Sequence, residues 1–84
     1  MKKFKIKLNT SKDVSNFINL TTRCVDKVNV YSGRYIVNGK SIMGVFSLDL
    51  TKPVEVEFCG DIPLDVKAGI QKYIIEEEAL WQII

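Results

Sequence analysis

The sequence contains no histidine, which removes every mechanism that uses an imidazole as a base, a metal ligand or a phosphate acceptor. Its two cysteines, Cys24 and Cys59, lie far apart and form neither a CxxC pair nor another metal-binding spacing. We therefore expect two half-buried thiols in a reducing cytoplasm, with a disulfide or a shared metal as the alternative. The sequence predicts no metal site and no cofactor.

Long apolar runs are also missing. No run approaches the roughly 20 residues that a membrane span needs. The basic N-terminus alternates between lysine and apolar residues, and it lacks the continuous apolar stretch of a signal peptide. The sequence therefore predicts a soluble, cytoplasmic protein with no membrane span.

Length and charge set further bounds. A chain of 84 residues can bury one modest core, so we expect a single domain over residues 1–84. The net charge is only +2, and the acidic run from Glu76 to Glu78 argues against a nucleic-acid partner. These observations predict a small globular domain that does not bind nucleic acid.

Four segments have the features of β-strands. Residues 2–8 and 53–58 alternate between apolar and charged side chains, with lysines in the first segment and glutamates in the second. If these two strands are neighbours, their lysines and glutamates face each other on the exposed side of the sheet. Two shorter strands, residues 28–31 and 34–37, flank the turn signal Ser32–Gly33.

Three segments have the apolar spacing of an amphipathic helix. The first lies in residues 10–28 with an apolar stripe from Val14 to Val28, and either Thr10 or Ser11 can cap its N-terminus. The second is short and covers residues 41–48, and the third covers residues 61–84. The buried stripe of the third helix is expected to consist of Val66, Ile70, Tyr73, Ile74 and Leu80.

The order of these elements predicts the fold class. It reads strand, helix, strand, strand, short helix, strand, helix, and the helices must all cover one face of the sheet. We therefore expect an α+β domain, an open-faced two-layer sandwich with a four-stranded antiparallel sheet and helices on one face.

The segment "KSIMGVFSLDL", from Lys40 to Leu50, carries a resemblance to a known family. It is similar to the histidine-containing phosphocarrier HPr of the sugar phosphotransferase system, in which "KSIMG" opens the short second helix. The similarity extends in order and residue type from about Val28 to Phe58. The resemblance implies the HPr fold, and it implies that Ser41 is the target of a regulatory serine kinase.

The chain departs from this family at the position of the phosphocarrier motif. The family has a histidine, an arginine and a proline just after the first strand, whereas this chain reads "LNTSKDVSNF" from Leu8 to Phe17. We therefore predict that phosphohistidine carrier activity is lost. Asp13 is expected to be an acidic residue of the first helical turn, and an acyl phosphate on its carboxylate is the alternative.

Ser41 is retained, and two interpretations of it stay open. A serine is a favoured helix cap with or without regulation. A phosphate at a helix N-terminus would also meet free backbone N–H groups, and Lys40 could partly neutralise its charge. We therefore predict Ser41 as a candidate phosphorylation site as well as a cap.

The apolar residues after Ser41 are candidates for partner binding. In the HPr family the exposed side of this helix docks the regulatory kinase and a transcriptional repressor. By that resemblance Ile42, Met43 and Phe46, together with Lys40, are predicted to bind a protein partner. The alternative is that Ile42, Val45 and Phe46 all belong to the core.

These residues lead to a prediction of function. We expect an HPr-like regulatory protein, not an enzyme, that binds a serine kinase or a transcriptional regulator through the Ser41 helix. The catabolite-repression homologue of HPr likewise lacks the histidine and keeps the serine. The alternative is an interaction module without phosphorylation, including a homodimer. At the end of the sequence, Trp81, Ile83 and Ile84 either pack on the sheet or pair with another copy.

Overall fold

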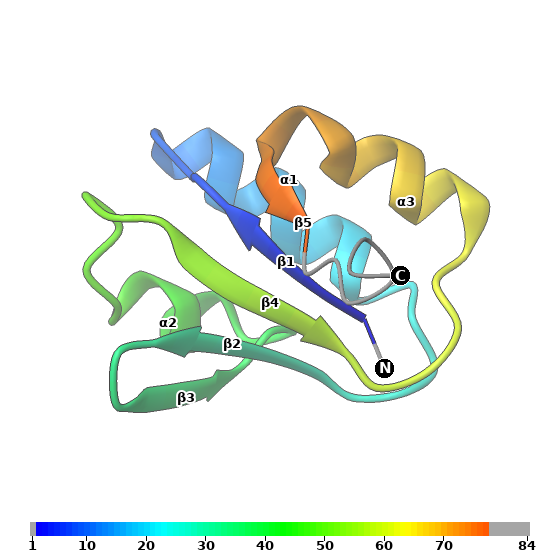
Figure 1. Cartoon of the computed structure of the whole chain (residues 1–84), viewed down its shortest axis with the longest axis horizontal. Helices are drawn as coiled ribbons and strands as arrows, with labels where there is room; N and C mark the ends of the chain where they lie inside the picture. Colours follow the sequence, from blue (N-terminus) through cyan, green and yellow to red (C-terminus); the bar gives the residue numbers. More distant parts are fainter. Residues whose placement is uncertain (1, 78–84) are drawn as a thin grey trace, which may run out of the picture.

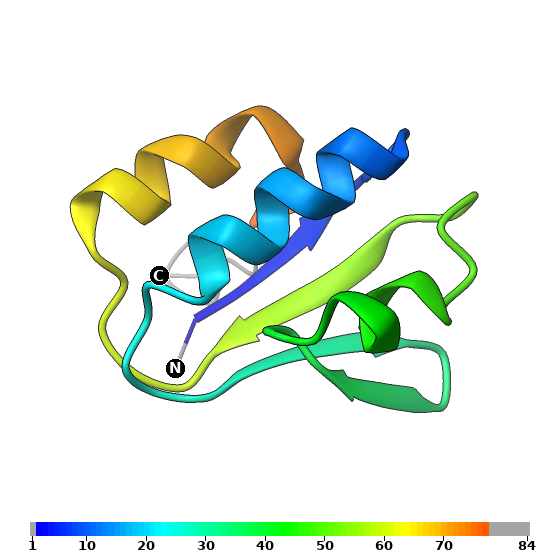
Figure 2. The ribbon, with the colours of Figure 1, turned by 180° about the vertical axis from the view of Figure 1, so that it is seen from behind.

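The computed structural model describes residues 2–77 of the chain. One antiparallel sheet has the strand order β3-β2-β4-β1-β5, and three α-helices cover one of its faces (Figures 1 and 2). The α+β class and the single helical layer are thereby confirmed. The elements are β1 (Lys2–Ile6), α1 (Ser11–Thr21), β2 (Val28–Ser32), β3 (Tyr35–Asn38), α2 (Ile42–Phe46), β4 (Val54–Phe58), α3 (Leu64–Ile70), a 3₁₀ turn η1 (Gln71–Tyr73) and β5 (Ile74–Glu77).

The two alternating strands are neighbours, as the charge pattern predicted. β1 and β4 pair antiparallel, with Lys3 opposite Glu57 and Lys5 opposite Glu55. Because side chains alternate along a strand, the apolar residues of both strands point to the helical layer and the charged residues to the open face. The facing lysines and glutamates therefore help to fix the register of the two central strands.

The first helix is shorter than its apolar pattern predicted. α1 begins after its N-cap Thr10 and ends at Thr21, where Thr22 serves as the C-cap. Beyond that point Cys24 is buried in the connecting loop, while Val28 already belongs to β2. The expected continuation to Val28 is wrong, because threonine and valine are weak helix formers and β2 offers Val28 a buried place in the sheet.

The C-terminal element differs most from the prediction. α3 begins after Pro63 and ends at Ile70, and the chain then passes through η1 into a fifth strand. β5 pairs antiparallel with β1, and the Lys7 N–H also donates to the Tyr73 carbonyl at 2.9 Å. The expected four-stranded sheet and 24-residue helix are therefore wrong, because the free edge of β1 takes up residues 74–77 as a strand. Leu80, Trp81, Ile83 and Ile84 lie outside the described residues.

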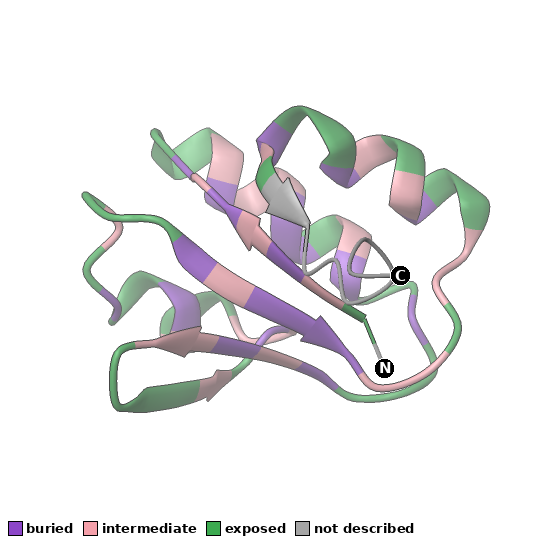
Figure 3. Ribbon diagram, in the orientation of Figure 1, coloured by how far each residue is buried: buried purple, intermediate pink, exposed green. Residues whose placement is uncertain are grey.

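The core lies between the sheet and the three helices (Figure 3). Phe4 and Phe58, from adjacent strands, meet edge to face with their ring centroids 6.0 Å apart. α1 contributes Val14 and Phe17, and α2 contributes Val45, all essentially fully buried. Of the predicted stripe of the last helix, Val66, Ile70 and Tyr73 are buried and Ile74 is partly exposed.

Candidate functional site

Ser41 caps α2, as the sequence predicted. Its Oγ accepts a hydrogen bond from the Gly44 N–H at 3.1 Å, and its carbonyl accepts one from the Val45 N–H at 3.0 Å. The Ser41 backbone is extended, which is the usual geometry of an N-cap residue. The side chain is half-buried, so the hydroxyl lies at the start of the helix near the protein surface.

Gly44 allows α2 to lie close to β3. A Cβ atom at this position would lie 3.3 Å from Ser41 Oγ and 3.4 Å from Val37 Cβ, which is tighter than most packed contacts. Glycine lowers helix propensity, and α2 has only five residues. The helix is therefore held by its cap and by packing against the sheet rather than by its own propensity.

Lys40 does not point its charge at Ser41. Its Nζ donates a hydrogen bond to the Cys24 carbonyl at 2.6 Å, and its backbone N–H donates to Asn38 Oδ1 at 2.9 Å. These bonds tie the turn before α2 to the loop after α1. The sequence indicated Lys40 as a counter-charge for Ser41, whereas the structure engages its ammonium group elsewhere.

The apolar side chains of α2 divide between the core and the surface. Val45 is fully buried, whereas the exposed fractions of Ile42, Met43 and Phe46 are 39%, 77% and 43%. We call these three residues the α2 patch. The alternative that Ile42, Val45 and Phe46 all belong to the core is wrong for Ile42 and Phe46, because a helix of five residues can turn only one side toward the sheet.

A groove of about 370 Å³ lies between the start of α1 and the end of α2. One residue of the α2 patch, Phe46, also lines this groove. Lys7 crosses one side of it, because its Nζ donates to Asn9 Oδ1 at 2.9 Å and to the Leu50 carbonyl at 3.1 Å. No pattern in the sequence indicated this role of Lys7, which joins segments far apart in the chain. The groove is lined by Lys7, Leu8, Asn9, Thr10, Ser11, Val14, Phe46, Leu50 and Thr51.

The start of α1, where the HPr family carries its histidine, is closed by a capping box. Thr10 Oγ1 accepts from the Asp13 N–H at 3.1 Å, while Asp13 Oδ2 accepts from the N–H groups of Asn9 and Thr10 at 3.0 and 3.2 Å. The carboxylate of Asp13 is thus occupied by backbone donors. This arrangement agrees with Asp13 as a first-turn residue and gives no support to an acyl phosphate.

The cysteines do not form a joint site. Cys24 is buried and Cys59 is half-buried, and neither forms a disulfide. Burial raises the pKa of the Cys24 thiol above its ordinary value, so this residue stays protonated near neutral pH. Within residues 2–77 no group of three or more histidine, cysteine, aspartate or glutamate side chains lies together as a metal site would require.

The open face of the sheet carries a polar network that the sequence did not indicate. The Tyr31 hydroxyl donates to Glu57 Oε1 at 2.6 Å, and Asn29 Nδ2 donates to the same oxygen at 3.3 Å. The hydrogen bond from Tyr31 is the main reason that the pKa of Glu57 lies below its ordinary value. Lys3 Nζ lies 5.1 Å from the centre of the Tyr31 ring. The expected pairing of lysine with glutamate thus holds for strand register, and the Tyr31 hydroxyl in addition donates a hydrogen bond to Glu57.

Comparison with known proteins agrees with this architecture. The strand order and the three helices on one face define an open-faced α+β sandwich. A solved structure of this kind, described as the crystal structure of HPr-C-His from Thermoanaerobacter tengcongensis, superimposes with a TM-score of 0.70. The two chains are 22% identical, and the alignment covers 86% of this chain and 89% of that chain. The fold of the chain is therefore HPr-like.

No family model matches the sequence, and no curated protein matches it. Among the described helices, none is long and apolar enough to cross a membrane.

Proposed function

We propose that the chain is a regulatory protein with an HPr-like fold that binds a protein partner through the α2 patch and does not carry a phosphohistidine. The observation that carries this proposal is the exposure of Ile42, Met43 and Phe46 beside a half-buried Ser41. Apolar side chains that gather on one exposed helix surface are typical of protein-binding sites. Lys40 belongs to the same segment and fixes its position through Cys24.

The absence of carrier activity rests on chemistry. The chain has no histidine, and the start of α1 is occupied by the Thr10–Asp13 capping box. Reversible phosphoryl transfer needs a nucleophile that accepts the group and passes it on. The carboxylate of Asp13 already accepts two backbone hydrogen bonds as part of the helix cap, and this structural role explains the residue without a phosphoryl group. We propose that the protein acts by binding and not as an enzyme or a carrier, and that it is a single cytoplasmic domain.

Ser41 is the proposed control point of this surface. A phosphate on Oγ would add a charge of about −1.5 to −2 directly beside the α2 patch. Such a charge changes the affinity of an apolar surface for its partner, because desolvation of the phosphate opposes burial. The partner that fits this arrangement is a serine kinase or a transcriptional regulator that distinguishes the two states of Ser41.

Phosphorylation is tested with the purified full chain, the HPr serine kinase and ATP, with intact mass as the measurement. We expect one added phosphate on the wild type and none on Ser41→Ala. Ser47→Ala is the matched control, because Ser47 lies at the other end of α2 and bonds the Gly44 carbonyl. An unmodified wild type beside an active kinase and its natural substrate would overturn the Ser41 proposal for that kinase, and the interaction module without phosphorylation would then be favoured.

Partner binding is tested separately from phosphorylation. The wild type and Met43→Ser are used as immobilised baits for the proteins of the source cells, and bound proteins are identified by mass. We expect a serine kinase or a transcriptional regulator that the wild type retains and Met43→Ser loses. Equal recovery on both baits would show that the α2 patch is not the binding surface.

A further inference from the structure

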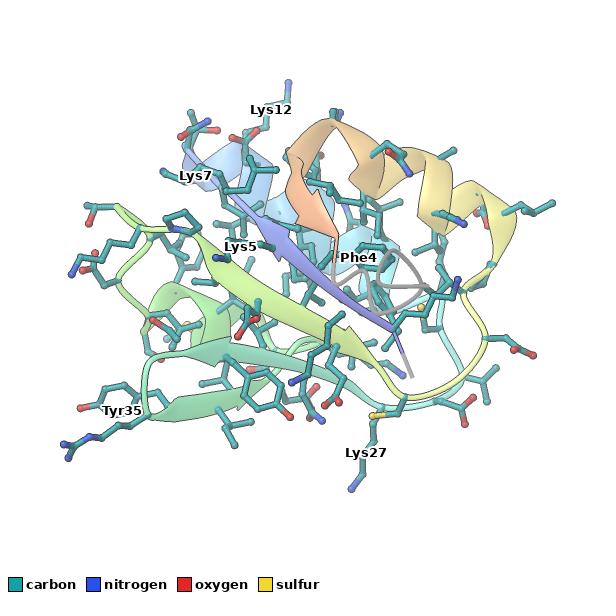
Figure 4. The ribbon with its side chains drawn as sticks, viewed as in Figure 1. Phe4, Lys5, Lys7, Lys12, Lys27 and Tyr35 are labelled. Carbon is teal, nitrogen blue, oxygen red and sulfur yellow. The ribbon has the colours of Figure 1, made fainter. Side chains whose placement is uncertain are left out.

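A second surface, separate from the α2 patch, lies at the β3 edge of the sheet. β3 is the terminal strand of the sheet order, and within residues 2–77 no strand pairs with its outer side (Figure 1). Tyr35 and Ile36 are strongly exposed, with 71% and 61% of their surface open. Figure 4 shows Tyr35 at this outer edge, with its ring directed away from the molecule.

The β3 edge, although only four residues long, lacks three of the features that usually protect an edge strand. Natural edge strands carry lysine, proline or a bulge that prevents pairing with another chain. The sequence Tyr35–Asn38 contains no charged residue and no proline, and it pairs with β2 over four consecutive residues without a register shift. The opposite edge strand, β5, has two glutamates in its sequence, Glu76 and Glu77. The two edges therefore differ in chemistry.

The backbone of β3 has hydrogen-bonding groups that point outward. The Gly39 N–H donates to the Val28 carbonyl at 2.6 Å, toward β2. Because backbone groups alternate in direction along a strand, Val37 and Tyr35 also face β2, and the N–H groups of Ile36 and Asn38 face the open edge. The carbonyl of Ile36 points outward as well. An added strand would find donors and an acceptor in register.

The charged residues nearest to β3 along the sequence have a single sign, whereas Glu55 and Glu57 lie on β4, with β2 between them and β3. No aspartate or glutamate occurs between Lys27 and Leu48, whereas Arg34 and Lys40 flank β3 on its two sides. The ammonium group of Lys40 is bound to the Cys24 carbonyl, so Arg34, which is exposed in the β2–β3 turn, supplies the accessible charge. This exposed cationic charge favours an acidic partner segment at the β3 edge.

We propose that the β3 edge binds an extended acidic segment of a partner protein as an additional antiparallel strand. Its main chain would pair with the outward groups of Ile36 and Asn38. Its acidic side chains would lie on the open face near Arg34, and its apolar side chains on the helical side, where Tyr35 and Val37 lie. This binding goes beyond the proposed function, because it requires neither the α2 patch nor a phosphate on Ser41.

The proposal is tested by titrating the full chain with a short blocked peptide in which glutamate and valine alternate, followed by amide chemical shifts. We expect the largest shifts at residues 35–38 and saturation below about 1 mM. The matched probe is the same peptide with lysine in place of glutamate, which we expect to bind at least about tenfold more weakly, since repulsion replaces attraction. The kinase assay tests only the phosphorylation of Ser41, and the peptide titration tests only the β3 edge. A negative result in one of them therefore leaves the other proposal standing.

Two variants test the geometry. Arg34→Glu, at an exposed turn position, is expected to weaken the glutamate peptide about twofold to tenfold. Ile36→Pro removes one outward N–H and should therefore weaken binding of the glutamate peptide. An edge strand tolerates proline at such a position, so the variant is expected to fold. Its matched control is Ile36→Thr, which keeps the N–H and is expected to bind within about threefold of the wild type. If Ile36→Pro does not fold, the affinity of Arg34→Glu for the glutamate peptide still tests the proposal.

Four results would overturn the proposal. The first is no saturation at about 1 mM peptide. The second is equal binding of the lysine peptide, and the third is a set of shifts confined to β5, the α2 patch or the groove. The fourth is a concentration-dependent shift of the β3 amides without any peptide, which would show that a second copy of the chain occupies this edge.

Discussion

The Tyr31 hydroxyl donates a hydrogen bond of 2.6 Å to Glu57 Oε1 across two adjacent strands on the open face of the sheet. This contact joins β2 to β4 on the side that carries no helix, and Glu57 is largely shielded from solvent although it lies on the exposed face. The pKa of Glu57 is thereby held below its ordinary value of 4.5, and the pKa of Tyr31 is raised above its ordinary value of 10.0.

Tyr31→Phe should flatten the dependence of stability on pH. A carboxylate with a lowered native pKa stabilises the fold above pH 4.5, and this stability is lost as pH falls further. A phenol with a raised native pKa stabilises the fold below pH 10.0, and this stability is lost as pH rises further. We therefore expect the urea midpoint of Tyr31→Phe to fall less than that of the wild type both below pH 4.5 and above pH 10.0. Identical profiles of variant and wild type would show that the contact has no energetic weight.

Ser41→Ala should destabilise α2 through loss of its cap. The Ser41 hydroxyl is the acceptor for the Gly44 N–H, and such caps contribute about 0.5–2 kcal/mol. Ser41→Asp should retain most of this stability, because aspartate is an equally favoured cap. The measurement is urea unfolding of both variants beside the wild type. Equal loss in Ala and Asp would mean that the oxygen does not cap the helix.

Thr21→Val should destabilise the fold more than Thr22→Val, the same substitution at the exposed neighbouring position. Thr21 is fully buried, and its hydroxyl lies 2.7 Å from the Gly39 carbonyl and 3.1 Å from the Ile18 carbonyl. Valine keeps the shape but leaves the Gly39 carbonyl without this partner, at a cost of about 1–3 kcal/mol. Thr22→Val is the control, since that hydroxyl is exposed and bonds only the preceding turn. Thermal unfolding should separate the two variants, and similar midpoints would contradict the role of Thr21.

Asp13→Ala should weaken the start of α1. Its carboxylate accepts from the backbone N–H groups of Asn9 and Thr10, and loss of such a capping interaction destabilises by about 0.5–2 kcal/mol. Lys12→Ala is the matched control, because Lys12 is exposed in the same helical turn. Hydrogen exchange of the first-turn amides should accelerate in Asp13→Ala and not in Lys12→Ala. Unchanged exchange in both would show that the capping box is not needed.

Much of the fold could be predicted because its signals are local. The alternation of residues 2–8 and 53–58 gave two strands and their facing charges, and Ser41 identified the start of α2. Caps and alternating patterns depend on residues within a few positions of each other, so a sequence contains them directly. The same local pattern failed for Cys24 and Val25, which continue an apolar spacing without continuing the helix.

The candidate site could be predicted only in part. The sequence indicated Ser41, Met43 and Phe46, and their exposure in the structure is compatible with partner binding, which stays a prediction. It gave no signal for Lys7 in the groove, because its partner Leu50 lies 43 positions away. It also assigned the charge of Lys40 to Ser41, whereas a loop from another part of the chain binds it. Contacts between distant segments depend on how the elements pack.

The sequence by itself determined the α+β class, the capped starts of α1 and α2, the exposed lysine and glutamate side of the central strands and the absence of imidazole chemistry. Only the tertiary structure decided that residues 74–77 form a strand. Their apolar spacing is compatible with a helix, but β1 has an open edge next to η1. Pairing of residues 74–77 with this edge satisfies backbone groups of β1 that would otherwise be left to solvent. The same packing left β3 as the opposite edge, because no other described segment reaches its outer side.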